Sequence, residues 1–327
     1  MGDQLEAVHK ERTHVLAEQT QGGLAFVFPG QGSQYVGMGW DLYNTYTAAR
    51  RLFEEAEAIL SFSLSRLCFE GPEDELTDTI NAQPAILTTS AAFLAVLKEK
   101  AGDRPAPAFV AGHSLGEYMA LLAAEVLDFP SALRLVRERG RVMKEAGQKQ
   151  PGAMAAVLGL DAMSLRVICD EVGEVWLAND NAPGQIVLSG REPALEQALR
   201  LAIERGARRI IRLAVSIASH SPLMASAAKS FTAPVEKAPL AQALVPIVVN
   251  VTASPVVEPV DIRLELVQQL TSPVRWVESV HYMIAHGVRT FVEIGPKNVL
   301  SRLINQIDRR VQAWSVGSVA ELEALKV

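Results

Sequence analysis

The chain has 327 residues, of which 49% are hydrophobic, and its formal net charge is -6. This length can bury one large core, or form a main body with a smaller unit beside it. The negative charge disfavours nucleic acid as a partner, because nucleic-acid-binding proteins concentrate positive charge on one face.

The two cysteines and the N-terminal segment indicate in which cellular compartment the protein works. Cys68 and Cys169 lie far apart, without a CxxC or Cys/His spacing, so the sequence predicts neither a disulfide framework nor a metal site. Residues 1–23 form an N-terminal extension without the continuous apolar core of a signal peptide. No run approaches the ~18 apolar residues that cross a bilayer. We therefore expect a cytoplasmic protein with no membrane partner.

Three short apolar runs predict the strands of a main sheet. They lie at 24–28, 109–111 and 290–294, and each ends at or just before a glycine or proline. A helical pattern at 299–307 follows the third run. Strands that alternate with helices indicate a parallel sheet with both faces covered, so the expected class is α/β.

A second group of elements lies between these runs. Residues 154–158, 185–189 and 209–215 are predicted as strands, with helices at 162–172 and 192–205. This series predicts a small α+β unit at 151–216. The main body would then consist of 24–150 and 217–327.

The pentapeptide GHSLG at 112–116 matches the G-x-S-x-G nucleophile elbow, in which small residues permit a strained turn between strand and helix. An apolar run precedes it, and 117–126 has a helical pattern. We interpret Ser114 as the nucleophile, with the backbone N–H of Leu115 directed at the oxyanion of an attacked thioester. An ordinary glycine-rich turn is the alternative.

A nucleophilic serine needs a base, and the chain offers six histidines. His220 lies in a polar turn directly after an apolar strand. The other five lie in the extension, beside the nucleophile or in a helical stretch. We therefore predict His220 as the base; a surface-loop histidine is the alternative.

A second glycine loop, GQGSQ at 30–34, follows the first predicted strand. It lacks the third glycine of a dinucleotide fingerprint and the Gly-Lys-Ser/Thr of a P-loop. Two interpretations stay open: a turn whose backbone N–H groups supply a second oxyanion donor, or a plain turn.

Arg139 occupies an unexpected position in a predicted helix. Residues 131–146 have helical periodicity, and Arg139 falls on the apolar face, where a guanidinium needs an anionic partner. One explanation is structural: Arg139 pairs with a buried carboxylate of this chain or extends to the surface. The other is that its partner is the substrate. A malonyl thioester carries a free carboxylate that suits the guanidinium fork, whereas an acetyl thioester does not.

Together these segments resemble the malonyl-CoA:acyl carrier protein transacylases, a family that includes stand-alone fatty-acid enzymes and polyketide synthase acyltransferases. The resemblance covers about 24–307. It rests on six motifs: FPGQGSQ at 28–34, GHSLGE at 112–117, Arg139-Gly140, NDNAPGQ at 179–185, SHS at 219–221 and EIGP at 293–296.

The resemblance implies an α/β-hydrolase-like body with an inserted ferredoxin-like subdomain. It also implies transfer of a malonyl group from malonyl-CoA to an acyl carrier protein, through an acyl-serine ester and without a permanently bound cofactor. The implied site consists of Ser114 as nucleophile, His220 as base, the backbone of Gln31 and Leu115 as oxyanion hole, Arg139 as carboxylate clamp, and the backbone carbonyl of Gln269 as the group that orients the histidine.

The residues before the histidine depart from the patterns of polyketide acyltransferases. Malonyl-selective domains often have His-Ala-Phe-His and methylmalonyl-selective domains Tyr-Ala-Ser-His, whereas this chain has IASH at 217–220. Malonyl is our first choice of substrate, and an α-substituted malonyl is the alternative.

Two other functions are alternatives to acyl transfer. Acyl hydrolysis by the same Ser/His pair is the rival activity. A carrier-docking module without catalytic activity is less consistent with the sequence, because it would not need that pair.

A basic segment predicts where an acidic carrier protein would dock. Residues 191–212 contain six arginines against three glutamates on a chain that is negative overall. A solvated helix face is an equally good interpretation.

Overall fold

The computed structural model describes residues 23–101 and 106–324. The predicted extension lies outside the described residues, except for Gly23. Six strands form the main sheet in the order β10-β9-β1-β2-β7-β8, and all neighbours are parallel except β7 and β8. The strands are β1 (Gly23–Phe28), β2 (Phe109–Gly112), β7 (Ile247–Val248), β8 (Pro255–Val256), β9 (Val288–Ile294) and β10 (Gln312–Val316).

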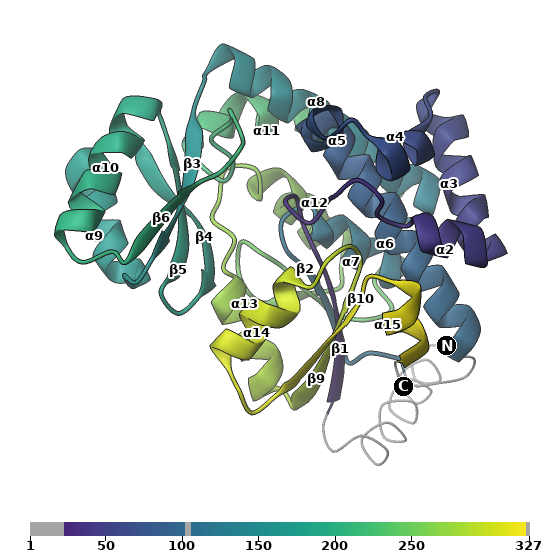
Figure 1. Ribbon diagram of the computed structural model, residues 1–327. Helices are drawn as coiled ribbons and strands as arrows, with labels where there is room; N and C mark the ends of the chain where they lie inside the picture. Colours follow the sequence, from purple (N-terminus) through teal and green to yellow (C-terminus); the bar gives the residue numbers. More distant parts are fainter. Residues whose placement is uncertain (1–22, 102–105, 325–327) are drawn as a thin grey trace.

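Helices cover both faces of this sheet (Figure 1). In β1, Leu24 and Phe28 point into the larger core, whereas Ala25 and Val27 point into the smaller one. The larger core is formed with α3 (Thr47–Leu60), α6 (Thr79–Ala101), α7 (Gly116–Ala123), α8 (Phe129–Lys149), α11 (Ala225–Lys237) and α12 (Pro259–Gln268). The smaller core is formed with α13 (Trp276–Ala285) and α14 (Val299–Ile307). Short helices complete the body: α2 (Trp40–Thr45), α4 (Leu64–Glu70), α5 (Glu73–Thr77), α15 (Val319–Ala324) and the 3-10 turn η1 (Pro222–Met224).

Helix α6 is apolar enough to bear on the expectation that no segment crosses a membrane. Its segment 79–100 has the length of a membrane span, and its most apolar 18-residue window has a mean hydropathy of 1.4. In the structure 83% of its most apolar window is buried, and it packs against α3 and α8. Its apolar character is therefore that of a central core helix.

A second, antiparallel sheet lies beside the body, with strand order β4-β5-β3-β6 (Figure 1). The order of elements is βαββαβ, the ferredoxin-like arrangement that the resemblance implied. The elements are β3 (Ala153–Leu158), α9 (Ala162–Val172), β4 (Val175–Ala182), β5 (Gln185–Gly190), α10 (Glu192–Glu204) and β6 (Arg209–Arg212). The predicted class, a parallel α/β body with a separate α+β unit, is confirmed. Strand β4 was not predicted, and β6 ends earlier than expected.

The end of β4 joins the small sheet to the body. Asn179 forms a parallel bridge with Val274, whose carbonyl accepts from the Asp180 N–H at 3.0 Å and whose N–H donates to Ala178 at 2.8 Å. Ala182 is buried in the smaller core of the body. The small unit is therefore attached at β4 as well as through its two chain crossings.

Candidate active site

The turn between β2 and α7 has the geometry of a nucleophile elbow. Ser114 has a φ of +52°, in the left-handed region that non-glycine residues rarely occupy. A Cβ on Gly112 would lie 1.9 Å from the carbonyl carbon of Gly116, so the turn requires glycine at this close approach. Asn250 supports the turn: its Oδ1 accepts from the Ser114 N–H at 2.6 Å, and its Nδ2 donates to the Gly112 carbonyl at 2.7 Å.

His220 faces the serine as a neutral acceptor. The Oγ of Ser114 lies 2.8 Å from Nε2 of His220, and Nδ1 lies 2.9 Å from the carbonyl oxygen of Gln269 and 3.1 Å from that of Ser272. Because carbonyl oxygens only accept, Nδ1 carries the proton and Nε2 accepts from the serine hydroxyl. Burial, and then the charge of Arg139, lowers the pKa of His220 to about 3. The imidazole is therefore neutral and ready to take a proton.

Arg139 reaches the same serine from α8. Its side chain is 1% exposed, as its place on the apolar face predicted. Nη2 donates to Ser114 Oγ at 3.1 Å and to Gln269 Oε1 at 2.9 Å, and Nη1 donates to Gln83 Oε1 at 2.9 Å. Among the described residues, no carboxylate lies within 4.0 Å of this guanidinium. Its hydrogen-bond partners are neutral, so its charge is available to an anion.

Gln269 contacts every member of this group. Its backbone carbonyl accepts from His220, and its side-chain Oε1 accepts from Arg139. Its Nε2 donates to the Ser114 carbonyl at 3.1 Å and to Glu117 Oε2. Burial and the nearby Glu265 charge raise the pKa of Glu117 well above its usual range, and burial raises the pKa of Glu265 to about 7. A protonated Glu117 is therefore the form that we expect beneath Gln269.

The glycine loop after β1 packs against the elbow. A Cβ on Gly30 would lie 2.3 Å from the carbonyl oxygen of His113, so this close contact also depends on glycine. The loop is closed by the Ser33 hydroxyl, which donates to the Gly30 carbonyl at 2.8 Å. Within the described part of the chain, the backbone N–H groups of Gln31 and Leu115 donate no hydrogen bond. Both are thus available as oxyanion donors.

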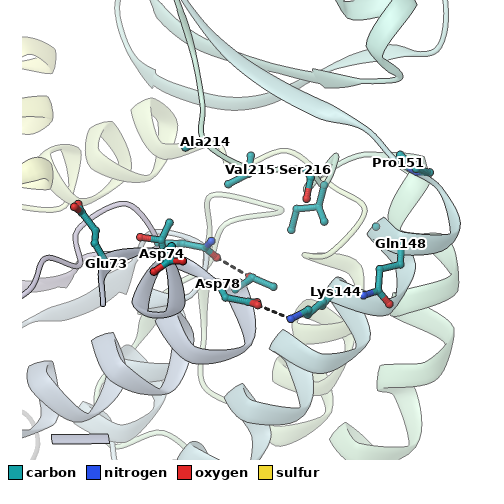
Figure 2. A pocket seen from close by; sticks show the side chains of 14 residues that line it. Glu73, Asp74, Asp78, Lys144, Gln148, Pro151, Ala214, Val215 and Ser216 are labelled. Carbon is teal, nitrogen blue, oxygen red and sulfur yellow. Dashed lines mark hydrogen bonds and ion pairs between the residues drawn. The ribbon is translucent and has the colours of Figure 1, made fainter. Parts of the chain in front are cut away.

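A cavity of about 950 Å³ opens beside this group. It is lined by α5, the start of α6, the end of α8 and the segment 214–217 that leads out of the small sheet (Figure 2). Gln31 and Ile217 belong to its wall, so it extends to the glycine loop and to the chain just before the histidine. Asp78 on its rim forms an ion pair with Lys144 (Figure 2).

The histidine beside the nucleophile points elsewhere. His113 Nε2 lies 2.8 Å from Asn181 Oδ1, at the end of β4. Its imidazole also meets the ring of Trp276 edge-on. His113 therefore links the elbow to the small sheet, and we assign it no proton transfer.

The basic segment 191–212 is partly neutralised. Arg191 pairs with Glu174 at 2.8 Å, Arg205 pairs with Glu171, and Arg212 pairs with two glutamates of α10. The remaining arginines are exposed and have no ion pair with the described residues: Arg200, Arg208 and Arg209.

The sequence from 25 to 322 matches the family described as the acyl transferase domain. The chain belongs to this acyltransferase family. A curated malonyl CoA-acyl carrier protein transacylase from Bacillus subtilis strain 168 is 49% identical over 304 residues, which cover 92% of this acyltransferase and 95% of the relative. The Escherichia coli K12 protein of the same name is 44% identical over 303 residues, covering 92% and 97%.

Solved structures share the fold of this acyltransferase. An acyl carrier protein S-malonyltransferase from Vibrio cholerae superposes with a TM-score of 0.89 at 39% identity, covering 93% of this chain and 100% of the other. A malonyl-transacylase in complex with its type II PKS acyl-carrier protein also has a TM-score of 0.89, at 41% identity and coverages of 92% and 98%. These neighbours confirm the predicted family and fold.

The structure brings together the six residues that the motifs and the resemblance singled out, but several of their partners were not predicted. The missed side chains are polar residues in buried helical or post-strand positions: Thr79, Gln83, Glu117, Asn250 and Glu265. The available signal was a glutamine inside the apolar 79–100 helix and a glutamate directly after the elbow.

Proposed function

We propose that this acyltransferase transfers a malonyl group from coenzyme A to the phosphopantetheine thiol of an acyl carrier protein, through an ester on Ser114. One observation carries the proposal. The Ser114 hydroxyl is hydrogen-bonded both to a neutral imidazole and to a buried guanidinium that has no carboxylate partner in the described chain. The first contact serves nucleophilic attack, and the second serves recognition of an acid.

In the first half-reaction, His220 Nε2 takes the hydroxyl proton as Ser114 Oγ bonds to the thioester carbonyl carbon. The carbonyl oxygen becomes an oxyanion, which the N–H groups of Gln31 and Leu115 stabilise. The carbon–sulfur bond then breaks, and the imidazolium returns its proton to the leaving coenzyme A sulfur. Malonyl-Ser114 remains.

The second half-reaction runs in reverse with a different thiol. The pantetheine thiol gives its proton to His220, and its sulfur attacks the ester carbonyl. The same two N–H groups stabilise the second oxyanion, and the ester carbon–oxygen bond breaks. The Ser114 oxygen regains its proton from the imidazolium, so the enzyme returns to its starting state.

Arg139 favours a substrate with a free carboxylate. In the free enzyme Nε has no hydrogen-bond partner in the described chain, and Nη2 donates to the neutral Oε1 of Gln269. An anion can therefore bind Nε and replace Gln269 at Nη2 in a bidentate, charge-assisted pair, while Nη1 keeps its bond to Gln83. A simple acyl group would leave the charge buried and unpaired, which is costly. This argues against a hydrolase of plain acyl esters, and it suits malonyl and α-substituted malonyl groups alike.

Intact-mass measurement tests the proposal. Wild-type enzyme mixed with malonyl-CoA should gain one malonyl group and lose it on addition of holo acyl carrier protein. Ser114→Ala should never gain it. Parallel samples with methylmalonyl-CoA and acetyl-CoA determine the acyl preference. Wild type without an adduct, or an adduct on Ser114→Ala, contradicts the ester route.

We further propose that the enzyme works in the cytoplasm. Cys68 and Cys169 are both free and buried, and burial raises the pKa of both thiols. Such thiols suit a reducing compartment. A tagged protein that fractionates with a periplasmic or membrane marker would contradict this.

A further inference from the structure

A chain of three side-chain hydrogen bonds connects Arg139 with the glycine loop. Arg139 Nη1 donates to Gln83 Oε1 at 2.9 Å, and Gln83 Nε2 donates to Thr79 Oγ1 at 3.2 Å. The Thr79 hydroxyl in turn donates to Gln31 Oε1 at 2.8 Å. Thr79 and Gln83 are one turn apart at the start of α6, with 8% and 0% of their surface exposed. The chain thus runs through the protein interior.

The direction of each bond follows from the one before it. A guanidinium only donates, so the Gln83 amide must present its oxygen to Arg139 and its nitrogen to Thr79. Thr79 Oγ1 accepts that nitrogen, which leaves its single proton for Gln31 Oε1. The hydrogen bonds within a buried chain of this kind strengthen one another, so breaking one of them weakens the next.

The backbone brings the two ends into reach. A Cβ on Gly140 would lie 2.9 Å from the Ile80 Cα and 2.9 Å from the Thr79 carbonyl oxygen, so α8 approaches α6 this closely only with glycine there. Gly140 follows Arg139, and the close approach lets the guanidinium reach Gln83. At the other end, Gln31 and Thr79 both line the cavity wall.

We propose that Thr79 is a positioning residue, which fixes the position of the Gln31 backbone N–H relative to the guanidinium of Arg139. The group that binds the substrate carboxylate and one donor of the oxyanion hole would then move as a connected unit. The inference rests on the proposed function, because it concerns the placement of a malonyl thioester between those two groups. Thr79 itself touches neither the substrate nor Ser114.

Three variants separate positioning from packing. Thr79→Val keeps the shape and removes the hydroxyl, whereas Thr79→Ser keeps the hydroxyl. Thr88→Val is the matched control, a buried threonine of the same helix whose Oγ1 has no hydrogen-bond partner in the described chain. Acylation by malonyl-CoA is followed in single-turnover quenched-flow experiments with intact-mass detection, and thermal unfolding is recorded for each variant.

Thr79→Val should acylate about 10- to 100-fold more slowly, the range expected for a displaced oxyanion donor. Thr79→Ser should stay within about threefold of wild type, the expected rescue by a retained hydroxyl, and Thr88→Val should be unchanged. Equal rates for Thr79→Val and wild type would overturn the proposal. So would slow acylation in both Thr79 variants with a matching loss of thermal stability, which is the signature of a packing role.

A double variant tests the connection to Arg139. In the Arg139→Ala background the guanidinium no longer orients the Gln83 amide that donates to Thr79, so Thr79→Val should slow acylation by less than about threefold. The full 10- to 100-fold effect in that background would show that Thr79 acts on the loop alone and would refute the coupling. Failure of wild type itself to gain malonyl mass would instead contradict the proposed function.

Discussion

Replacing Arg139 with alanine separates malonyl recognition from general acyl transfer. The substitution removes two effects of different kinds. One is the hydrogen bond to Ser114 Oγ at 3.1 Å, which serves every acyl group. The other is the pair with the substrate carboxylate, which only malonyl-type groups form. The ratio of malonyl to acetyl acylation cancels the first effect and isolates the second.

The size of the change in this ratio follows from burial. The guanidinium is 1% exposed, so its pair with a carboxylate is desolvated. Truncating one partner of such a pair costs about 2 to 5 kcal/mol, and about 1.4 kcal/mol corresponds to a tenfold change. The ratio of the two kcat/KM values should therefore fall by about 30-fold or more.

Competing acylation measures this ratio directly. Wild type and Arg139→Ala are mixed with equal concentrations of malonyl-CoA and acetyl-CoA, and the two ester masses on Ser114 are compared at early times. Arg134→Ala, which removes an exposed arginine of the same helix, is the control and should leave the ratio unchanged. An Arg139→Ala enzyme that loses both activities equally would refute carboxylate recognition by Arg139.

Three further predictions concern the base, its titration and the carrier protein. His220→Ala should slow acylation by about two to four orders of magnitude in stopped-flow assays, and a near-normal rate would exclude it as the base. The pKa of His220 is about 3 when folded and 6.5 ordinarily, so only the unfolded state gains its proton between these values, and stability falls as pH falls. From pH 6.5 to 5 wild type should lose about 1.6 kcal/mol relative to His220→Ala in urea unfolding; an unchanged difference would contradict the neutral imidazole. Reversing the charges of Arg200, Arg208 and Arg209 should weaken transfer to an acidic carrier protein but not acylation by malonyl-CoA, with Arg309 reversal as control; unaffected transfer would exclude this surface.

The sequence predicted the strands that have a simple pattern. β1, β2 and β9 are apolar runs closed by glycine or proline, and their positions are confirmed within one or two residues. β4 was missed because it ends in the polar residues 179–181, which pair with β5 and also contact the body at Val274 and His113. β7 and β8 have only two residues each, too few for any periodicity to be visible.

The residues of the candidate site also differ in whether the sequence alone could predict them. Ser114 and His220 lie in local motifs, and Arg139 contradicts the apolar face of its helix, so single segments were enough to select them. Their amide partners come from α6 and from the end of α12, and only tertiary packing brings these together. Arg137 illustrates the converse: helical periodicity places it opposite the apolar face of 131–146, yet it is half-buried and donates to the Ile80 carbonyl at 2.6 Å. Helical periodicity does not report where a neighbouring helix crosses.

The attachment of β4 to the body has a consequence for chimeric enzymes. Residues 151–216 could be exchanged between relatives to change which carrier protein is used, and this exchange needs only two junctions in the chain. The exchanged piece would carry Ala182, which fills part of the recipient's smaller core, and Asn181, which holds the histidine beside the nucleophile. It would also have to match the backbone around Val274 in the recipient. Chimeras should therefore retain activity more often when the donor also supplies 272–276, or when the recipient's 178–182 is left in place.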